Sequence, residues 1–140
     1  MIAYSTIIPF QEYVVDGYTV QAIPVDHTVP AVGYRVTSGG RTLVYTGDTG
    51  PTKAIWKSCS GVDVFIVEVS FPDSMEELAL VSKHLTSSML QNELAQFDVL
   101  PKRILITHPK PQYVDIIRHE IKLLNVDGME LLLGGSVYEI

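Results

Sequence analysis

Residues with β-branched and aromatic side chains are concentrated in the first half of the chain, whereas apolar residues recur at helical spacing in the second half. Longer unbroken apolar runs, typical of strands covered on both faces, occur around Phe65 and Leu105. The turn formed by Ser38, Gly39 and Gly40 predicts a hairpin. We expect strands at 18–25, 31–38, 41–47, 62–69 and 103–107.

Helices are predicted between and after these strands. Pro51 favours the first turn of a short helix that ends at Gly61. Apolar residues at helical spacing predict three more helices, and Thr86 or Ser87 is expected to cap the second of them. These helices are expected at 75–83, with Leu78, Leu80 and Val81, at 87–97, with Met89, Leu90, Leu94 and Phe97, and at 111–124. Strands alternating with helices indicate an α/β fold of one domain, residues 1–140.

Composition and charge narrow the function classes. The 140 residues are 46% hydrophobic and carry a net charge of −6, and Lys and Arg are scattered, so nucleic acid is not an expected partner. The single cysteine excludes an internal disulfide and favours a reducing compartment. No signal peptide pattern is present at the start, and no apolar run approaches the ~18 residues needed to cross a bilayer. We therefore expect a soluble, cytoplasmic protein with no membrane partner.

Two of the predicted strands end on polar residues. LVYT is followed by Gly47 and Asp48, and RILIT is followed by His108. Ligands of α/β folds gather at strand ends, and a carboxylate with an imidazole suits zinc, manganese or iron. Two alternatives stay open at this point: Asp48 forms a turn or caps the helix near Pro51, and His108 is a structural hydrogen-bonding residue.

Five motifs in one order carry a family resemblance. VDHTVPAVGYRV, YTGDTG, DVFIVEVSF, KHLTSSMLQNEL and ILITHPKPQY, within about residues 18–124, resemble the C-terminal half of the metallo-β-lactamase superfamily. They are most similar to class II cyclic-nucleotide phosphodiesterases, with ribonuclease Z as the next branch. The resemblance implies half of an αββα sandwich, a mixed sheet with helices on one face.

The resemblance also implies roles for three residues. Asp48 resembles the carboxylate that bridges a divalent metal pair, and His108 resembles the last histidine ligand of one metal; the metal is zinc, manganese or iron. His84 resembles a second-sphere histidine that stabilises charge on a phosphate or protonates the leaving oxygen. The alternative for His84 is a role in capping the following helix or packing between helices.

Further residues near these motifs are weaker candidates. His27 matches a substrate-side position, although a histidine that fills a bend is the alternative. Lys110 is a candidate phosphate contact, although most exposed lysines only increase solubility. We expect His119 to lie on the surface, and Glu68 either to pair with a site histidine or to point out at the end of its strand.

One ligand motif of the family is missing from this sequence. Relatives bind most of their metal through HxHxDH and a further histidine upstream of the matched region, and this sequence contains no HxH. Two ligands do not retain a catalytic metal pair. We therefore expect a truncated metal-dependent phosphodiester hydrolase that is inactive alone, with a small phosphodiester as substrate. The alternative is a non-catalytic dimeric or partner-binding module, so enzyme status stays open.

A single half of such a sandwich exposes an apolar sheet face that must be covered. Three origins are considered: a fragment whose other half was removed, a short protein that pairs with itself, and one that pairs with a separate complementary N-terminal half. We favour a two-fold homodimer, which would restore the sandwich with the same patch on both subunits.

Overall fold

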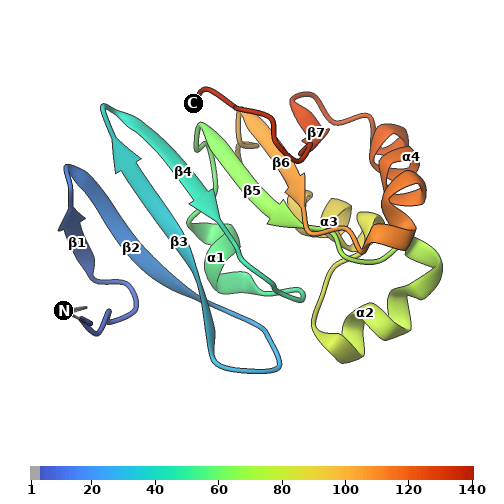
Figure 1. Cartoon of the computed structure of the whole chain (residues 1–140), viewed down its shortest axis with the longest axis horizontal. Coiled ribbons are helices and arrows are strands. Elements are labelled where there is room, and N and C mark those ends of the chain that lie inside the picture. The colour runs from blue at the N-terminus through green and yellow to red at the C-terminus, as the bar shows by residue number, and fades with distance from the viewer. Residues whose placement is uncertain (1–3) are drawn as a thin grey trace.

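The computed structural model describes residues 4–140, which build one seven-stranded mixed sheet with the strands in sequence order (Figure 1). The first four strands pair antiparallel and the last four, starting from β4, pair parallel. The strands are β1 (Glu12–Val15), β2 (Tyr18–Val25), β3 (Ala31–Ser38), β4 (Arg41–Tyr45), β5 (Val64–Glu68), β6 (Arg103–Thr107) and β7 (Met129–Leu131).

Strand direction determines which loops meet. Strand β2 is antiparallel to β3, and β3 is antiparallel to β4, so β2 runs in the same direction as β4, β5 and β6. The carboxyl ends of these four strands therefore lie at one edge of the sheet, which we call the rim. Loops at such an edge are the usual place for a functional site in α/β folds.

The helices follow the strands and cover one face of the sheet. They are α1 (Lys53–Lys57), α2 (Glu76–Ser82), α3 (Ser87–Leu94) and α4 (Val114–Leu124), with the 3-10 turns η1 (Asp73–Met75) and η2 (Pro111–Tyr113) before α2 and α4. Val44, Phe65 and Ile104 point from β4, β5 and β6 into the core under these helices and are 0% exposed. Trp56 of α1 packs edge-on against Phe65, with ring centroids 5.7 Å apart.

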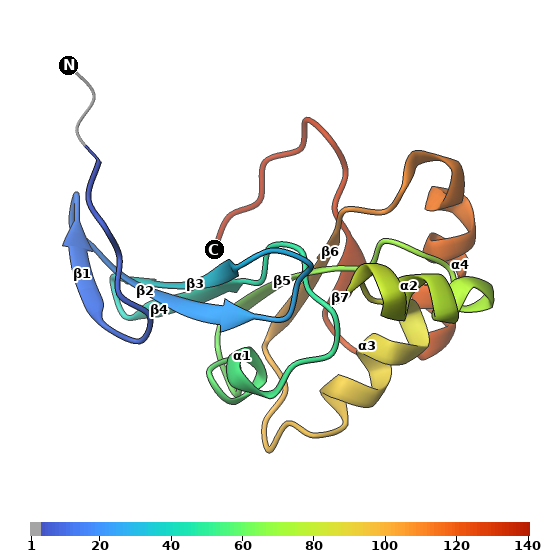
Figure 2. The same ribbon diagram turned by 90° about the horizontal axis from the view of Figure 1, so that it is seen from below.

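The opposite face of the sheet is only partly covered. Figure 2 shows α1 and α3 on one side of the sheet and the C-terminal segment on the other. Val64 and Leu105 are buried on this second face, whereas Tyr45, the neighbour of core residue Val44, is 41% exposed. A groove of about 450 Å³ runs beside them; it is lined by Tyr18, Val36, Ser38, Arg41, Leu43, Tyr138 and Ile140.

The predicted fold class, an α/β sheet with helices on one face, is confirmed. All five expected strands are present, although the strands predicted at 41–47 and 62–69 are shorter, at 41–45 and 64–68. Strands β1 and β7 were not predicted. The helix expected at 87–97 ends at Leu94, and Thr86 is its N-cap, accepting a hydrogen bond from the Met89 amide at 3.3 Å.

Helix α2 differs from its expected packing. Leu78, Leu80 and Val81 are 45%, 50% and 80% exposed, and Ala79 is the buried residue of this helix. Helical spacing therefore predicted the helix correctly but did not predict which of its residues are buried. None of the helices described in residues 4–140 is long and apolar enough to cross a membrane.

Candidate functional site

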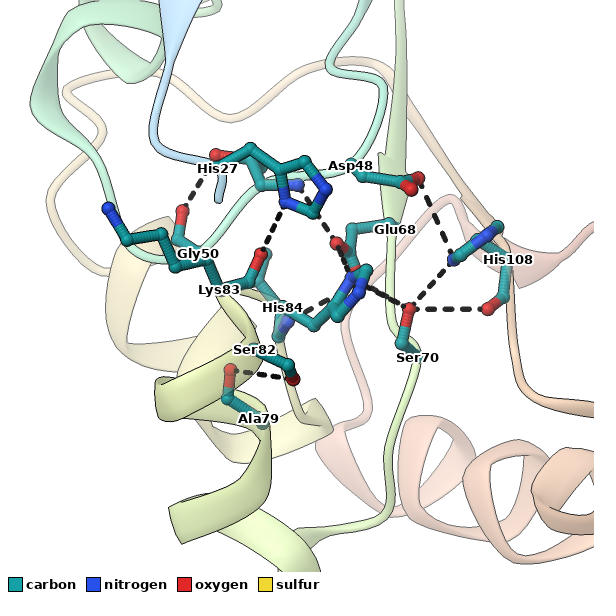
Figure 3. Close-up of polar contacts among 12 residues, drawn as sticks. His27, Asp48, Gly50, Glu68, Ser70, Ala79, Ser82, Lys83, His84 and His108 are labelled. Carbon is teal, nitrogen blue, oxygen red and sulfur yellow. Dashed lines mark hydrogen bonds and ion pairs between the residues drawn. The ribbon is translucent and has the colours of Figure 1, made fainter. Parts of the chain in front are cut away.

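Four polar residues from separate loops meet at the rim (Figure 3). Asp48 follows β4, Glu68 ends β5, His84 lies between α2 and α3, and His108 follows β6. These positions are up to 60 residues apart in sequence and are brought together by the order β4, β5, β6 in the sheet. The site is therefore a product of topology rather than of one local motif.

Asp48 and His108 converge, as the sequence analysis expected. His108 Nδ1 lies 3.6 Å from Asp48 Oδ1, and the two side chains are 41% and 38% exposed. Both loops leave their strands through left-handed backbone, with φ of 62° at Gly47 and 64° at His108. A non-glycine residue in this region costs free energy and is concentrated at functional sites.

The two alternative interpretations of Asp48 and His84 as helix caps are not supported. The residue at the N-cap of α1 is Thr52, four positions beyond Asp48, and the cap of α3 is Thr86 rather than His84. His84 is instead a buried residue at the rim, 8% exposed. Its Nδ1 faces site residues, with Glu68 Oε1 at 2.6 Å and Ser70 Oγ at 3.2 Å.

Glu68 is the fully buried centre of the site. Its carboxylate accepts hydrogen bonds from His84 Nδ1 at 2.6 Å and from the Thr49 amide at 2.9 Å. The other oxygen accepts from Ser70 Oγ at 2.6 Å and from the Leu85 amide at 3.4 Å. Four donors satisfy a buried charge that would otherwise be costly. Of the two expectations for Glu68, the structure therefore supports pairing with a site histidine.

The same contacts position the loop that carries Asp48. The Thr49 amide is held by Glu68, and Thr49 Oγ1 donates to the Gly50 carbonyl at 2.8 Å. Thr49 Oγ1 also accepts from the Asp26 amide at 3.2 Å. The turn after β4 is therefore attached both to β5 and to the loop after β2, which limits the movement of the Asp48 carboxylate.

Ser70 was not identified from the sequence. Its hydroxyl lies 2.8 Å from His108 Nδ1 and 2.6 Å from Glu68 Oε2. Because the carboxylate can only accept, the hydroxyl proton points to Glu68, and the oxygen accepts from His108 Nδ1. The only sequence signal was its place two residues beyond Glu68, on the same side of an extended chain.

Hydrogen-bond partners define the protonation of three imidazoles. His27 Nδ1 lies 3.2 Å from the Lys83 carbonyl, His84 Nδ1 faces the Glu68 carboxylate, and His108 Nδ1 faces Ser70 Oγ. Each Nδ1 therefore carries a proton, and in the neutral ring each Nε2 carries a free lone pair. This arrangement, with Nδ1 held by an oxygen, is typical of histidines that bind metals.

The remaining candidates lie around this centre. His27 is at the rim, with its ring 5.3 Å from that of His84. Lys110 is partly buried, and its amine lies 5.8 Å from the centre of the Phe71 ring, which in turn contacts His84. His119 is exposed on α4, as expected. No contact places Lys110 on Asp48 or His108, so its phosphate role stays a prediction.

The donor atoms suit a divalent transition metal. Two groups within the described residues bring three candidate ligand atoms within 4.8 Å of one another: His27 with Asp48 and His84, and Glu68 with His84 and His108. Carboxylate and imidazole are ligands for zinc, iron and manganese. Asp48 and His108 fit the role of two ligands in a larger set.

A family model supports this assignment. The model described as "Beta-lactamase superfamily domain" matches residues 3–108. The chain therefore belongs to the metallo-β-lactamase superfamily.

Similar proteins include several named ribonuclease Z. That of Methanosarcina acetivorans is 32% identical over 83 residues, which are 59% of this chain and 27% of the relative. That of Pyrobaculum calidifontis is 37% identical over 81 residues, 56% of this chain and 27% of the relative. This chain thus matches about a quarter of the length of these curated relatives.

Solved structures with the same fold include YhfI from Bacillus subtilis, with a TM-score of 0.80 at 21% identity. The match covers 94% of this chain and 54% of YhfI. Human tRNase Z, short form, has a TM-score of 0.66 at 21% identity over 86% of this chain and 42% of the human chain. These likenesses establish the fold. Within the superfamily, the names of the curated relatives favour the ribonuclease Z branch over the cyclic-nucleotide phosphodiesterase branch that the motifs suggested.

Proposed function

We propose that this chain provides the carboxyl-terminal part of a metal-dependent phosphodiester hydrolase of the ribonuclease Z type. The convergence of Asp48 and His108 at the rim, 3.6 Å apart, carries the proposal. In it, Asp48 and His108 would be ligands of a divalent metal pair. Bound metals of this kind stabilise charge on phosphate oxygens and supply a nucleophile at neutral pH.

His84 is the proton donor in this proposal. Its Nδ1 donates to the buried Glu68 carboxylate at 2.6 Å, which fixes the orientation of the ring. A proton on Nε2 would then be available to the leaving oxygen of the substrate. Ser70 links Glu68 to His108, because its hydroxyl donates to the Glu68 carboxylate and accepts from His108 Nδ1.

The substrate class follows from the relatives rather than from the charge of this chain. Several relatives are named ribonuclease Z, which supports an RNA phosphodiester over a cyclic nucleotide. The net charge of −6 does not by itself attract RNA, so we place most of the contacts to an RNA backbone outside these 140 residues.

The test restores the rest of the fold. A fusion of the part of YhfI that this chain does not cover with residues 1–140 is purified, its metal content is measured, and hydrolysis of a model diester, a precursor tRNA and a cyclic nucleotide is assayed. We expect two metal equivalents and a preference for the tRNA. Asp48→Asn should abolish hydrolysis, whereas Asp127→Asn, at an exposed position, should not.

A second candidate function is a non-catalytic binding module. The absence of any HxH from the sequence favours it. The same fusion distinguishes the hydrolase from the binding module. Normal hydrolysis by the Asp48→Asn protein would refute a catalytic role of this rim. A folded, metal-loaded fusion that hydrolyses none of the three substrates would support the binding module.

We also propose that a second copy of the chain covers the exposed sheet face around Tyr45. The chain corresponds to 54% of YhfI, so roughly an equal amount of structure accompanies the matched part in that protein. A second copy has the right size to take this place, and two-fold pairing would bury the same face twice.

A further inference from the structure

The ligand group of His27, Asp48 and His84 shares Asp48 with the Asp48–His108 pair but does not include His108. The candidate ligand atoms of this group lie within 4.8 Å of one another, and all three residues belong to loops at the rim (Figure 3). We propose that the chain by itself binds one zinc ion through His27, His84 and Asp48, without ligands from any other segment. The site shares Asp48 and His84 with the proposed hydrolase, but zinc binding by the chain alone does not require hydrolysis.

The free atoms of the two histidines support this site. His27 Nδ1 donates to the Lys83 carbonyl and His84 Nδ1 donates to Glu68, which leaves both Nε2 lone pairs for a metal. Two imidazoles and one carboxylate are a common ligand set for zinc with an open position for water. At Zn–N distances of about 2.0–2.1 Å, tetrahedral ligand atoms lie about 3.4 Å apart. The three candidate atoms are within 4.8 Å of one another, so side-chain rotation is sufficient to bring them onto one ion.

The loops that carry these ligands are already attached to each other. Lys83 Nζ lies 2.6 Å from Asp26 Oδ1, beside His27, and the Gly50 amide donates to the Asp26 carbonyl at 2.8 Å. The loop after β2, the turn after β4 and the end of α2 are thereby joined on one side of the rim. Such second-sphere contacts orient ligands and increase metal affinity.

The other candidate group is less suitable for a metal. Both oxygens of Glu68 accept hydrogen bonds from buried donors, and its side chain is 0% exposed. A metal bound by Glu68 would displace these donors and leave them unsatisfied in the protein interior, which costs about 1–3 kcal/mol for each. Asp48, at 38% exposure, has no such donors among its described contacts.

Metal binding at this site and proton donation by His84 are mutually exclusive. A zinc ion on His84 Nε2 occupies the lone pair that a proton needs for general-acid catalysis. Zinc held by the chain alone therefore removes His84 from the chemistry assigned to it above. A complete family ligand set would compete for the same Asp48 carboxylate and release His84.

The experiment is zinc titration of the purified 140-residue chain by calorimetry, with Co²⁺ absorption to report coordination. We expect one site per chain. His27→Asn, Asp48→Asn and His84→Asn should each weaken zinc binding by more than about 100-fold, because loss of even a second-sphere partner costs roughly 10–100-fold. His119→Asn should bind zinc as the parent does, and His108→Asn should retain a saturable zinc site.

The pattern across variants separates this inference from the proposed function. Loss of zinc binding in the His108→Asn protein with retention in the His27→Asn protein would assign the metal to the family pair and overturn the inference, as would absence of saturable binding by the parent. Failure of the fusion enzyme to hydrolyse RNA would leave the zinc result unaffected.

Imidazole ¹⁵N NMR of the parent protein serves as the readout if a variant does not fold. The chain has only four histidines, so each ring can be followed. Zinc should shift Nε2 of His27 and His84 the most and leave the ring of His119 unchanged. Shifts confined to His108, or equal in all four rings, would contradict the site.

Discussion

At the scale of single residues, the rim depends on one buried carboxylate. Glu68 was expected either to pair with a site histidine or to point out at the end of its strand, and Ser70 was not noted at all. Their partners, Thr49, His84 and His108, come from three other loops. Spacing along the chain contains no information on such contacts, because they arise from the order of β4, β5 and β6. The convergence of Asp48 and His108 was predictable because each follows a clear strand closely, whereas their roles as metal ligands were implied only by the family resemblance.

Replacement of Glu68 tests this dependence. Glu68→Gln substitutes an amide donor for one acceptor oxygen, so buried donors from His84, Thr49 or Ser70 lose their partner. We expect the free energy of unfolding to fall by about 2–4 kcal/mol, measured by urea unfolding. Glu130→Gln is the control, since Glu130 is half exposed and pairs with Arg103 at 2.8 Å; its effect should stay below about 1 kcal/mol. Equal losses in both variants would contradict the role of Glu68.

Cys59 allows a prediction on pH. Burial raises the pKa of its thiol from 9.0 to about 12, and the thiol donates to the Ile55 carbonyl. The unfolded chain therefore ionises this thiol above pH 9 while the folded chain does not. The contribution to stability is complete below pH 9 and is lost between pH 9 and 12, by about 1.4 kcal/mol per pH unit.

The comparison protein for this pH effect is Cys59→Ala. Urea unfolding from pH 8 to 11 should show a steeper loss of stability for the parent than for the variant, since tyrosines and lysines titrate equally in both. Parallel pH curves would show that the thiol does not contribute. The native parent should also react slowly with a thiol reagent at pH 7 and rapidly once unfolded.

At the scale of elements, the strands with strong apolar patterns were predicted nearly to the residue, because their burial is encoded locally. Strand β1 was missed because it is mostly exposed, so its pairing with β2 rather than its own pattern defines it. Strand β7 has three residues, too few for a periodic signal. Helix α2 was found by spacing, but which side it would bury depends on the neighbouring elements.

Gly33 shows how closely these elements pack. A Cβ atom at Gly33 in β3 would lie 2.5 Å from Ile55 Cδ1 of α1 and 2.6 Å from the Tyr45 carbonyl of β4. The carbonyl belongs to the backbone and cannot rotate away, so Gly33→Ala should destabilise the fold by about 2–3 kcal/mol. Thermal and urea unfolding measure the change.

A second glycine provides the matched control for Gly33. Gly134 has no atom within 4 Å of an added Cβ and lies outside the strands, so Gly134→Ala should change stability by less than about 0.5 kcal/mol. If Gly33→Ala were equally neutral, α1 would have to pack on the sheet less closely than the structure shows.

At the scale of the whole molecule, the two faces of the sheet differ in what covers them. The helices bury one face, while Tyr45 and the groove beside it stay open on the other. The sequence predicted an uncovered face, since the resemblance extends over one half of a sandwich. Hydrophobic patterning alone does not specify what covers this face, because any apolar surface would satisfy it.

Pairing through this face is testable by sedimentation. Strand register places Tyr45 opposite Tyr34 on β3 and Ile66 on β5, so a charge at Tyr45 would lie at the centre of an apolar patch in a two-fold dimer. The parent should sediment as a dimer at micromolar concentration. Tyr45→Asp should sediment as a monomer, because two unpaired carboxylates would be buried at the interface. Val81→Asp, at an 80% exposed position on α2, should remain dimeric. A monomeric parent, or a Tyr45→Asp protein that still dimerises, would show that a second copy does not cover this face.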